Sequence, residues 1–387
     1  MLVVIIRIGT VFLNILYALI KLLPTQNKVV MISRQSNEPS MDFLLLKREI
    51  KRRYPETKVV LLCHTLDGGL NSSKLTKVRY CFHMLVQMYH LATSRVAILD
   101  TYCIPVSLLK HKSTLKVLQI WHSMGTMKKF GYTTVDTSEG TKKSIADAMK
   151  MHQNYDIVLA SAEAYKDHLA AGFQCDREKI VTAPLPRLDL LVNRPKYEAT
   201  VRTRIYEAYP QLREKPVILY CPTFRKDESS FTDAVLALRD ALDLEHFQLV
   251  VKLHPLSKLD LGDQVITAPE FSSFEMLFAA DYLISDYSCI VYEAAVRNIP
   301  LFFYDFDIDF YKDGRGLAID YFHELPGITS TEPAVIAKAI ADAEGGAYDR
   351  EALKAFADKY VHPTRHAAKD IVDLIAPFIS SQEEAVK

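Results

Sequence analysis

The sequence predicts an α/β protein built from two doubly wound domains that face each other across a cleft. Runs of β-branched residues alternate with amphipathic helical patterns, which is typical of parallel sheets covered on both faces. This alternation pauses between residues 184 and 216, a stretch with five prolines, and then resumes. A chain of 387 residues is also too long for one core and suits two domains of about 200 residues each.

The first element predicted is an amphipathic helix within the strongly apolar residues 1–23, which end at Pro24. Arg7, Asn14 and Lys21 are seven residues apart and form one polar stripe on a helix. This stripe favours a helix that lies in the membrane interface with its cations at the lipid headgroups. A membrane span and a helix packed on the protein are the alternatives, because the length just suffices to cross a bilayer. A cleaved signal peptide is not expected, because no small-residue cleavage site follows.

The first domain is predicted over residues 25–195, with helices at Met41–Arg53 and Thr141–His152 between its strands. Its expected strands are Val29–Ser33, Val59–Cys63, Val96–Asp100, Leu115–Trp121, Ile157–Ser161 and Ile180–Ala183.

The second domain is predicted over residues 196–387, after a connector that contains one helix. Residues 349–379 form helical patterns, and these last helices could cross back to the first domain. The expected strands of the second domain are Val217–Cys221, Leu249–Leu253, Gln264–Thr267, Tyr282–Ser285 and Leu301–Tyr304.

Composition and motif content argue against a nucleic-acid partner, disulfides, a metal and a cofactor. Basic and acidic residues both number 47, so no overall field attracts nucleic acid. The six cysteines have no metal-ligand spacing and fit free thiols in a reducing cytoplasm. Glycine-rich phosphate-binding motifs are also missing, as is a clear metal-binding pair of carboxylates, so we expect no metal and no cofactor. The alternating Asp305, Asp307 and Asp309 could bind a divalent ion, but a solvated loop is the favoured interpretation.

The main candidate site follows the apolar run that ends at Trp121. His122 comes directly after it, and Ser123, Gly125 and Thr126 form a short turn before a pair of lysines. Ligands of open α/β sheets bind at the carboxyl ends of strands, and glycine allows the backbone to approach a ligand closely. This pattern predicts a site that binds an anion and at which a proton is transferred.

A second strand, in the other predicted domain, ends in a similar way, at Lys252 and His254. The two residues share one face if the strand continues that far. Either histidine alone would more typically be structural. Histidines at equivalent strand ends of two similar domains favour one shared site.

A third candidate lies at Ser285, Asp286 and Ser288, where a strand is followed by a helix predicted to begin near Ser288. A helix N-terminus with small hydroxyls can bind phosphate, although ordinary capping also explains Ser285 and Asp286. Glu293 falls in an apolar part of the same helix, where it could bind a ribose diol or form a salt bridge with Arg297.

Two further strand ends carry arginines. Thr223 and Arg225 follow one strand, and Arg187 lies on a proline-flanked turn near the predicted domain boundary. The planar guanidinium is suited to phosphate oxygens, and a surface salt bridge is the alternative for each arginine.

Taken together, these motifs resemble those of the CDP-glycerol glycerophosphotransferase family, which primes and polymerises the teichoic acids of Gram-positive cell walls. The resemblance implies a GT-B-like fold of two Rossmann-type domains, with the acceptor side in residues 25–195 and the CDP-donor site mainly in residues 196–387. It also implies peripheral attachment at the cytoplasmic face of the cell membrane. The motifs that carry it are Trp121-His122-x-x-Gly125-Thr126, Pro186-Arg187-x-Asp189, Pro222-Thr223-x-Arg225, Lys252-x-His254-Pro255, Ser285-Asp286-Tyr287-Ser288 and Arg315-Gly316.

The resemblance also assigns a donor site, to which Arg225 is added from its position after a strand. The turn after His122 is one residue longer than in many relatives, which leaves the polyol open. Cys289 stands where relatives often have serine, and Glu293 where they often have aspartate. The assigned residues are His122, Ser123, Met124, Gly125, Thr126, Arg187, Pro222, Thr223, Lys252, His254, Ser288, Cys289 and Glu293.

The activity implied is transfer of glycerol phosphate or ribitol phosphate from a CDP-polyol to a hydroxyl of a lipid-linked acceptor, a prenyl-diphosphate saccharide, with release of CMP. His122 would be the general base, and His254 would stabilise the diphosphate or the leaving CMP. Single addition, polymerisation and homo-oligomerisation all stay open. The alternatives are a GT-B glycosyltransferase that uses a nucleotide sugar, and a non-catalytic membrane-associated nucleotide-binding scaffold.

Overall fold

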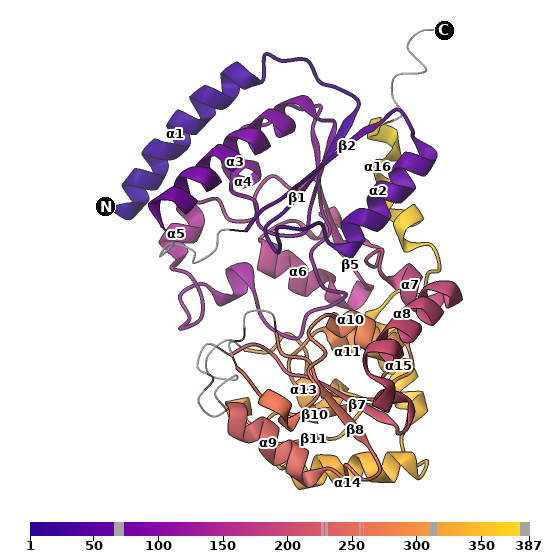
Figure 1. Ribbon diagram of the computed structural model, residues 1–387. Helices are drawn as coiled ribbons and strands as arrows, with labels where there is room; N and C mark the ends of the chain where they lie inside the picture. Colours follow the sequence, from indigo (N-terminus) through magenta and orange to yellow (C-terminus); the bar gives the residue numbers. More distant parts are fainter. Residues whose placement is uncertain are drawn as a thin grey trace. The chain divides into compact units, whose positions relative to one another are not determined.

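The computed structural model describes residues 1–65, 73–225, 228, 231–254, 257, 259–309 and 316–379. Figure 1 shows the chain, with each helix and strand labelled. The chain forms two compact units, and each contains one parallel sheet. Unit 1 comprises Met1–His122, Phe130–Asp189 and Thr364–Lys387, and unit 2 comprises Ser123–Lys129 and Leu190–Pro363. The predicted α/β class with parallel sheets is therefore confirmed.

Unit 1 contains a six-stranded sheet in the order β2-β1-β3-β4-β5-β6, in which all neighbouring strands are parallel. Every residue of β1 is buried, as expected for an apolar strand in the middle of a sheet covered on both faces. The strands are β1 (Lys28–Ser33), β2 (Lys58–Cys63), β3 (Val96–Leu99), β4 (Lys116–Gln119), β5 (Ile157–Ala160) and β6 (Ile180–Thr182).

The last helix that the structure describes belongs to unit 1. It packs against α2 (Figure 1), where Arg53 forms an ion pair with Asp373 at 2.7 Å. Helix α2 begins at its N-cap Ser40, whose side chain accepts a hydrogen bond from the Phe43 amide. The helices of unit 1 after the first are α2 (Met41–Arg53), α3 (Lys74–Thr93), α4 (Ile104–Leu108), α5 (Lys143–Ala148), α6 (Lys166–Phe173) and α16 (Ala367–Ile379).

Helix α1 (Leu2–Ile20) confirms the predicted N-terminal helix but corrects the role of its polar stripe. The Asn14 amide donates to the carbonyl of Leu108 at 3.1 Å, and the Lys21 ammonium donates to that of Lys110 at 2.7 Å. The stripe therefore faces the protein at these two residues, and not the lipid headgroups. Only Tyr17 of this helix is buried, so the apolar arc on its other side is exposed.

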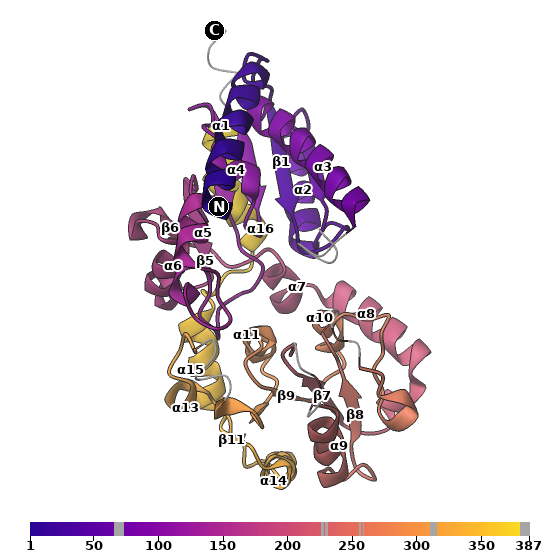
Figure 2. The ribbon, with the colours of Figure 1, turned by 90° about the vertical axis from the view of Figure 1, so that its left-hand side faces the viewer.

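Unit 2 contains a five-stranded sheet in the order β11-β10-β9-β7-β8, again with parallel neighbours. Apolar residues on one face of this sheet pack against α9 (Phe231–Ala241) and α14 (Pro333–Glu344), which lie together in Figures 1 and 2. Its strands are β7 (Val217–Cys221), β8 (Gln248–Val251), β9 (Tyr282–Ser285), β10 (Leu301–Tyr304) and β11 (Thr329–Ser330).

The second face of this sheet is covered by α11 (Ile290–Val296), which packs on β9 and β10 and against α15 (Arg350–Tyr360). Helix α7 (Leu188–Val192) lies where the chain passes from unit 1 to unit 2. The remaining α-helices described in unit 2 are α8 (Pro195–Ala208), α10 (Ser273–Met276) and α13 (Tyr321–Glu324).

One predicted strand is wrong. Gln264–Thr267 does not form a strand, since Gly262–Gln264 is a short 3-10 turn and only Ile266 makes a single parallel bridge, with Val250. The segment is short and follows a glycine with a φ of 53°, so its apolar pattern is too brief to sustain pairing. Strand β11 was not predicted, because two residues are too few to form a recognisable strand pattern in the sequence.

Candidate active site

The backbone turns sharply just before His122. Strand β4 ends at Gln119, two residues earlier than the sequence predicts, and Trp121 adopts a φ of 61°. A positive φ is strained for a bulky side chain and persists only where packing enforces it. Here the Trp121 ring packs on His122 at 4.2 Å and on Phe130 at 4.8 Å between centroids. This turn places His122 beyond the carboxyl end of the strand.

The hydrogen bond of His122 fixes its tautomer. Its Nδ1 lies 3.1 Å from the backbone carbonyl oxygen of Asp100, which follows β3. A carbonyl can only accept, so Nδ1 carries the proton and Nε2 keeps its lone pair. Burial lowers the pKa of His122 to about 4, against the opposing effect of the Asp100 carbonyl. The neutral imidazole is therefore the form present near pH 7, with Nε2 able to accept a proton.

This environment predicts the pH dependence of any reaction in which His122 is the base. Protonation removes the base, so kcat/KM should fall as the pH drops through the pKa of His122. Since that pKa lies near 4 and not at the ordinary 6.5, kcat/KM should stay nearly constant between about pH 7 and pH 5.5. A pH profile of kcat/KM in the folded range measures this. An acidic limb centred at pH 6.5 or above would show that His122 is not a desolvated base.

Arg187, which directly precedes α7, supports the backbone turn at His122. Its guanidinium donates to Asp42 Oδ2 through Nε at 2.9 Å and through a terminal nitrogen at 2.5 Å, and its amide donates to Oδ1. The same terminal nitrogen lies 3.5 Å from the carbonyl oxygen of His122. Asp42 is buried at the start of α2, so this pair is not the surface salt bridge that was the alternative, and a phosphate contact of Arg187 stays a prediction. The pair positions the backbone at His122.

The turn after His122 packs within unit 2. The Ser123 hydroxyl donates to the Gly125 carbonyl at 2.6 Å, and the Cys289 thiol donates to the same carbonyl at 3.3 Å. The Thr126 hydroxyl donates to the carbonyl of Lys128 at 2.7 Å, and Met124 is fully buried. Four residues of the predicted donor site, together with Cys289, therefore form one connected turn.

A cation, a hydroxyl and an imidazole meet in unit 2. The Lys128 ammonium donates to the Thr223 hydroxyl at 3.3 Å, and the His254 ring lies 5.4 Å from that of Phe224, the next residue after Thr223. Burial lowers the pKa of His254, and the positive charge of Lys128 lowers it further. Such a group can bind phosphate oxygens through one fixed charge and two hydrogen-bonding groups. The sequence marked Lys128 as one of a lysine pair but gave no sign of its partner.

Asp286 and Arg225 together join the loops that follow three strands of unit 2. The Asp286 carboxylate accepts from the Thr223 amide at 3.0 Å, from the Tyr287 amide at 2.6 Å and from the Arg225 guanidinium at 2.6 Å. Arg225 also pairs with Asp307 at 2.9 Å. Asp286 is fully buried and Arg225 nearly so. Both carboxylates thus engage the guanidinium, so Arg225 helps to position these loops, and its direct contact with a phosphate stays a prediction.

The acidic residues after β10 correct another expectation. Asp307 takes part in this ion pair and Asp305 is only 1 % exposed, so these two residues do not lie in the solvated loop predicted, whereas Asp309 is exposed. Among the described residues, no group of acidic, histidine or cysteine side chains is arranged to hold a metal ion.

The remaining donor-site residues lie near the ends of β8 and β9. The buried Lys252 ammonium donates to the carbonyls of Thr267 and Ala268 at 3.0 and 2.6 Å, and these bonds fix the position of residues 267 and 268. Ser288 lies half-buried in the loop before α11, which begins at Ile290, two residues later than expected. Glu293 is buried in α11, while Arg297 pairs with Glu198 at 2.9 Å.

Two of the predicted site residues, His122 and Arg187, belong to unit 1. The other residues belong to unit 2, and Pro255 and Arg315 of the motifs lie outside the described residues. Those in unit 2 are Ser123, Met124, Gly125, Thr126, Pro222, Thr223, Arg225, Lys252, His254, Ser288, Cys289 and Glu293.

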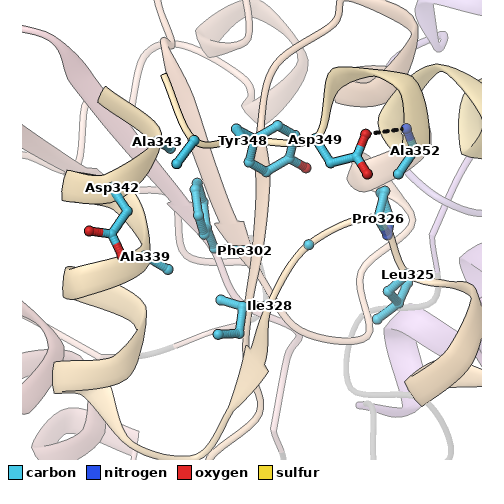
Figure 3. A pocket seen from close by; sticks show the side chains of 12 residues that line it. Phe302, Leu325, Pro326, Ile328, Ala339, Asp342, Ala343, Tyr348, Asp349 and Ala352 are labelled. Carbon is cyan, nitrogen blue, oxygen red and sulfur yellow. Dashed lines mark hydrogen bonds between the residues drawn. The ribbon is translucent and has the colours of Figure 1, made fainter. Parts of the chain in front are cut away.

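A hollow of about 440 Å³ in unit 2 contains none of these residues (Figure 3). It lies between α14 and the residues before α15, at the amino end of β10, where the Tyr348 hydroxyl accepts from the Leu301 amide at 3.0 Å. Asp349 on its rim caps α15 through the Ala352 amide. The predicted site residues follow the carboxyl ends of the strands, so this hollow is a separate feature.

Comparison with known proteins finds a family that matches nearly the whole chain. Residues 15–376 match the family described as CDP-Glycerol:Poly(glycerophosphate) glycerophosphotransferase. The chain is 29 % identical to the teichoic acid ribitol-phosphate primase of Bacillus spizizenii strain W23, over 93 % of this chain and 94 % of the primase. It is also 29 % identical to the teichoic acid glycerol-phosphate primase of Bacillus subtilis strain 168, over 63 % of this chain and 64 % of that protein.

Solved structures match the fold over nearly the whole chain. The wall teichoic acid polymerase TagF superposes with a TM-score of 0.74 and 23 % identity, covering 99 % of this chain and 98 % of that chain. The fold is therefore GT-B-like, as the resemblance implied.

Proposed function

The chain belongs to the CDP-glycerol:poly(glycerophosphate) glycerophosphotransferase family, and we propose that it transfers a polyol phosphate from a CDP-polyol to a hydroxyl of a lipid-linked acceptor, releasing CMP. The polyol is glycerol or ribitol, and the acceptor is a prenyl-diphosphate saccharide of teichoic acid synthesis. The similarity to a ribitol-phosphate primase, which extends over nearly all of both chains, supports this proposal.

The observation that carries the proposal is the tautomer of His122. Transfer requires a base that takes the proton of the acceptor hydroxyl as that oxygen attacks the polyol-bearing phosphorus. The Asp100 carbonyl holds the proton of His122 on Nδ1, which directs the basic Nε2 to that task. The bond between this phosphorus and the oxygen of CMP breaks as the new phosphoester forms, so CMP leaves with the electron pair.

Unit 2 would bind the nucleotide and neutralise its phosphates. His254 and Lys128 supply the groups next to the diphosphate, and Thr223, which accepts a hydrogen bond from Lys128, adds a hydroxyl. Arg225, Asp286 and Lys252 hold the loops that carry these groups. Most of the rate enhancement in phosphoryl transfer comes from such positioning and charge neutralisation.

Nucleotide binding and product release test the proposal. A ligand that binds only the folded state raises the melting temperature. We expect CDP-glycerol or CDP-ribitol to raise it and UDP-sugars to leave it unchanged, whereas a nucleotide-sugar glycosyltransferase would respond to UDP-sugars. With a prenyl-diphosphate disaccharide present, the CDP-polyol should also yield CMP. A scaffold without activity would bind the nucleotide and release no CMP.

The same proposal places the protein at the cytoplasmic face of the cell membrane, attached through α1 and α3. Helix α1 is long and apolar enough to cross a membrane, and it packs beside α3 (Figure 1). Neither helix contains Asp or Glu, and Arg7, Lys74 and Arg79 are exposed on them. Their exposed apolar residues repeat at alternate spacings of three and four, as on a helix lying in the interface, at Ile5, Ile8, Phe12, Ile15 and Leu19 of α1 and at Leu75, Val78, Phe82, Leu85 and Tyr89 of α3.

Removal of this surface should release the protein from membranes. We expect deletion of residues 1–23 to move the protein to the soluble fraction. We also expect the combined change Val78→Ser, Phe82→Ser and Leu85→Ser to weaken binding to phosphatidylglycerol vesicles at least about tenfold, because each change removes apolar area that the membrane would bury. Phe322→Ser, at an exposed phenylalanine of unit 2, is the matched control. Vesicle flotation measures the binding of the triple variant and of the control. Equal binding by the triple variant and the control would refute the role of α3.

A further inference from the structure

A second group of polar side chains lies at the carboxyl ends of the strands of unit 1. Arg34 directly follows β1, and His64 directly follows β2. Tyr80, His83 and Gln87 are three and four residues apart on α3 and share one face of it. The Arg34 guanidinium lies 5.8 Å from the Tyr80 ring centre, and the His64 ring lies 5.0 Å from that of His83. We call these five residues the unit 1 polar cluster.

Four atoms of this cluster are buried without a hydrogen-bond partner among the described residues. They are Arg34 Nε, the Tyr80 hydroxyl, His83 Nε2 and the Gln87 amide nitrogen. Tyr80 is 5 % exposed and Gln87 is 0 % exposed, so the protein covers them almost completely. A buried polar group without a partner is costly, and native proteins retain such groups for a ligand or an ordered water. Several in one place indicate a binding site.

The chemistry of these atoms selects the kind of ligand. Arginine, tyrosine and glutamine all present N–H or O–H donors here, so the ligand must offer acceptor oxygens. Arg34 makes no ion pair within the described residues, and a second of its nitrogens donates to the Tyr102 carbonyl at 3.3 Å. Burial raises the pKa of the nearby Asp100 carboxyl to about 7, which reduces its repulsion of an anion. A phosphate ester with neighbouring hydroxyls satisfies this set.

The cluster is continuous with the proposed base. The Arg34 amide donates to the Thr101 hydroxyl at 3.2 Å, and the adjacent Asp100 carbonyl accepts from His122. All of these residues follow β1, β3 or β4, which are neighbours in the sheet. A ligand held by the cluster therefore lies on the same sheet edge as the imidazole.

We propose that Arg34, Tyr80, His83 and Gln87 bind a phosphate group and hydroxyls of the acceptor substrate, beside the imidazole that takes its proton. This inference rests on the proposed function, because it assigns that reaction's second substrate to unit 1. It adds a binding site to the donor-site residues that the sequence motifs identify.

A binding experiment on the full chain tests the site without requiring turnover. Glycerol 3-phosphate is the probe, and glycerol is its uncharged control. We expect calorimetric titration to show binding of the phosphate ester that Arg34→Gln weakens at least about tenfold, since a charge-assisted hydrogen bond is lost. Arg79→Gln, which removes an exposed arginine one residue from Tyr80, should bind like the natural chain. Absence of binding to the natural chain, or equal affinities of the two variants, would overturn the proposal.

Tyr80→Phe separates binding from a structural role. Its hydroxyl has no partner among the described residues, so the change should weaken binding of glycerol 3-phosphate about fivefold without lowering the melting temperature. A lower melting temperature with unchanged affinity would show that the hydroxyl serves only the fold.

Steady-state kinetics decide which substrate the site holds. With a CDP-polyol and a prenyl-diphosphate disaccharide, Arg34→Gln should raise the KM of the acceptor about tenfold and leave the KM of the CDP-polyol unchanged. A rise in the KM of the CDP-polyol alone would assign the cluster to the donor and overturn the proposal. If the natural chain releases no CMP at all, the proposed function fails, while the calorimetric titration still decides whether the cluster binds a phosphate ester.

Discussion

Replacement of His122 by alanine is expected to lower turnover of CDP-polyol by at least about a hundredfold, the usual contribution of a general base. The reason is specific to this imidazole. Its Nδ1 proton is held by the Asp100 carbonyl, and its burial keeps it neutral near pH 7, so Nε2 is the basic atom. Without it the acceptor hydroxyl must lose its proton to water. The rate of CMP release at saturating substrates measures the effect.

A second variant separates loss of the base from loss of the fold. In His122→Asn the side-chain amide can still donate to the Asp100 carbonyl, but it offers no basic nitrogen. We expect its melting temperature to stay close to that of the natural chain and its turnover to fall as far as that of His122→Ala. Near-normal turnover in either folded variant would remove His122 from the role of base.

His254→Ala should cause a loss of similar size, at least about a hundredfold in turnover, for a different reason. The imidazole is exposed, and it lies next to Phe224 and close enough to Lys128 for that charge to lower its pKa. Its removal would leave negative charge on the diphosphate and on the departing CMP with one neutralising group fewer. The CMP-release assay measures this, with CDP-polyol binding followed by melting temperature.

His323→Ala is the matched control for this prediction, because His323 is a largely exposed histidine of the same unit. It should retain the turnover of the natural chain. If His254→Ala folds, binds the CDP-polyol and keeps normal turnover, His254 has no part in the chemistry.

The strand pattern of the fold could be predicted well from sequence because buried parallel strands are continuous apolar runs. The predicted strands Val217–Cys221, Tyr282–Ser285 and Leu301–Tyr304 have the observed bounds. Strand β4 is shorter than its apolar run, because the left-handed backbone of Trp121 ends the pairing. That conformation depends on packing by Phe130 and Phe173, which come from later in the chain, so no local pattern announced it.

The arginines of the site show why side-chain roles were harder to predict. Arg187 and Arg225 stand at strand ends, where a phosphate contact is a reasonable expectation. Their carboxylate partners, Asp42 and Asp307, are 145 and 82 residues away in the chain, so only the folded structure reveals them. The sequence likewise offered Asp286 as part of a phosphate site or as a helix cap, and gave no sign that its carboxylate joins the loop after β9 to the loop after β7. That His122 and His254 act on one diphosphate stays a prediction.

The position of the transferred phosphorus tests the central claim most directly. The donor would be CDP-glycerol or CDP-ribitol with a radioactive β-phosphorus, and the products would be separated after reaction with a prenyl-diphosphate disaccharide. Attack of the acceptor hydroxyl on that phosphorus predicts that all transferred label appears in the lipid-linked product and that the released nucleotide is unlabelled CMP. Release of labelled CDP, with an unlabelled lipid product, would mean that the polyol alone moves and would contradict phosphoryl transfer.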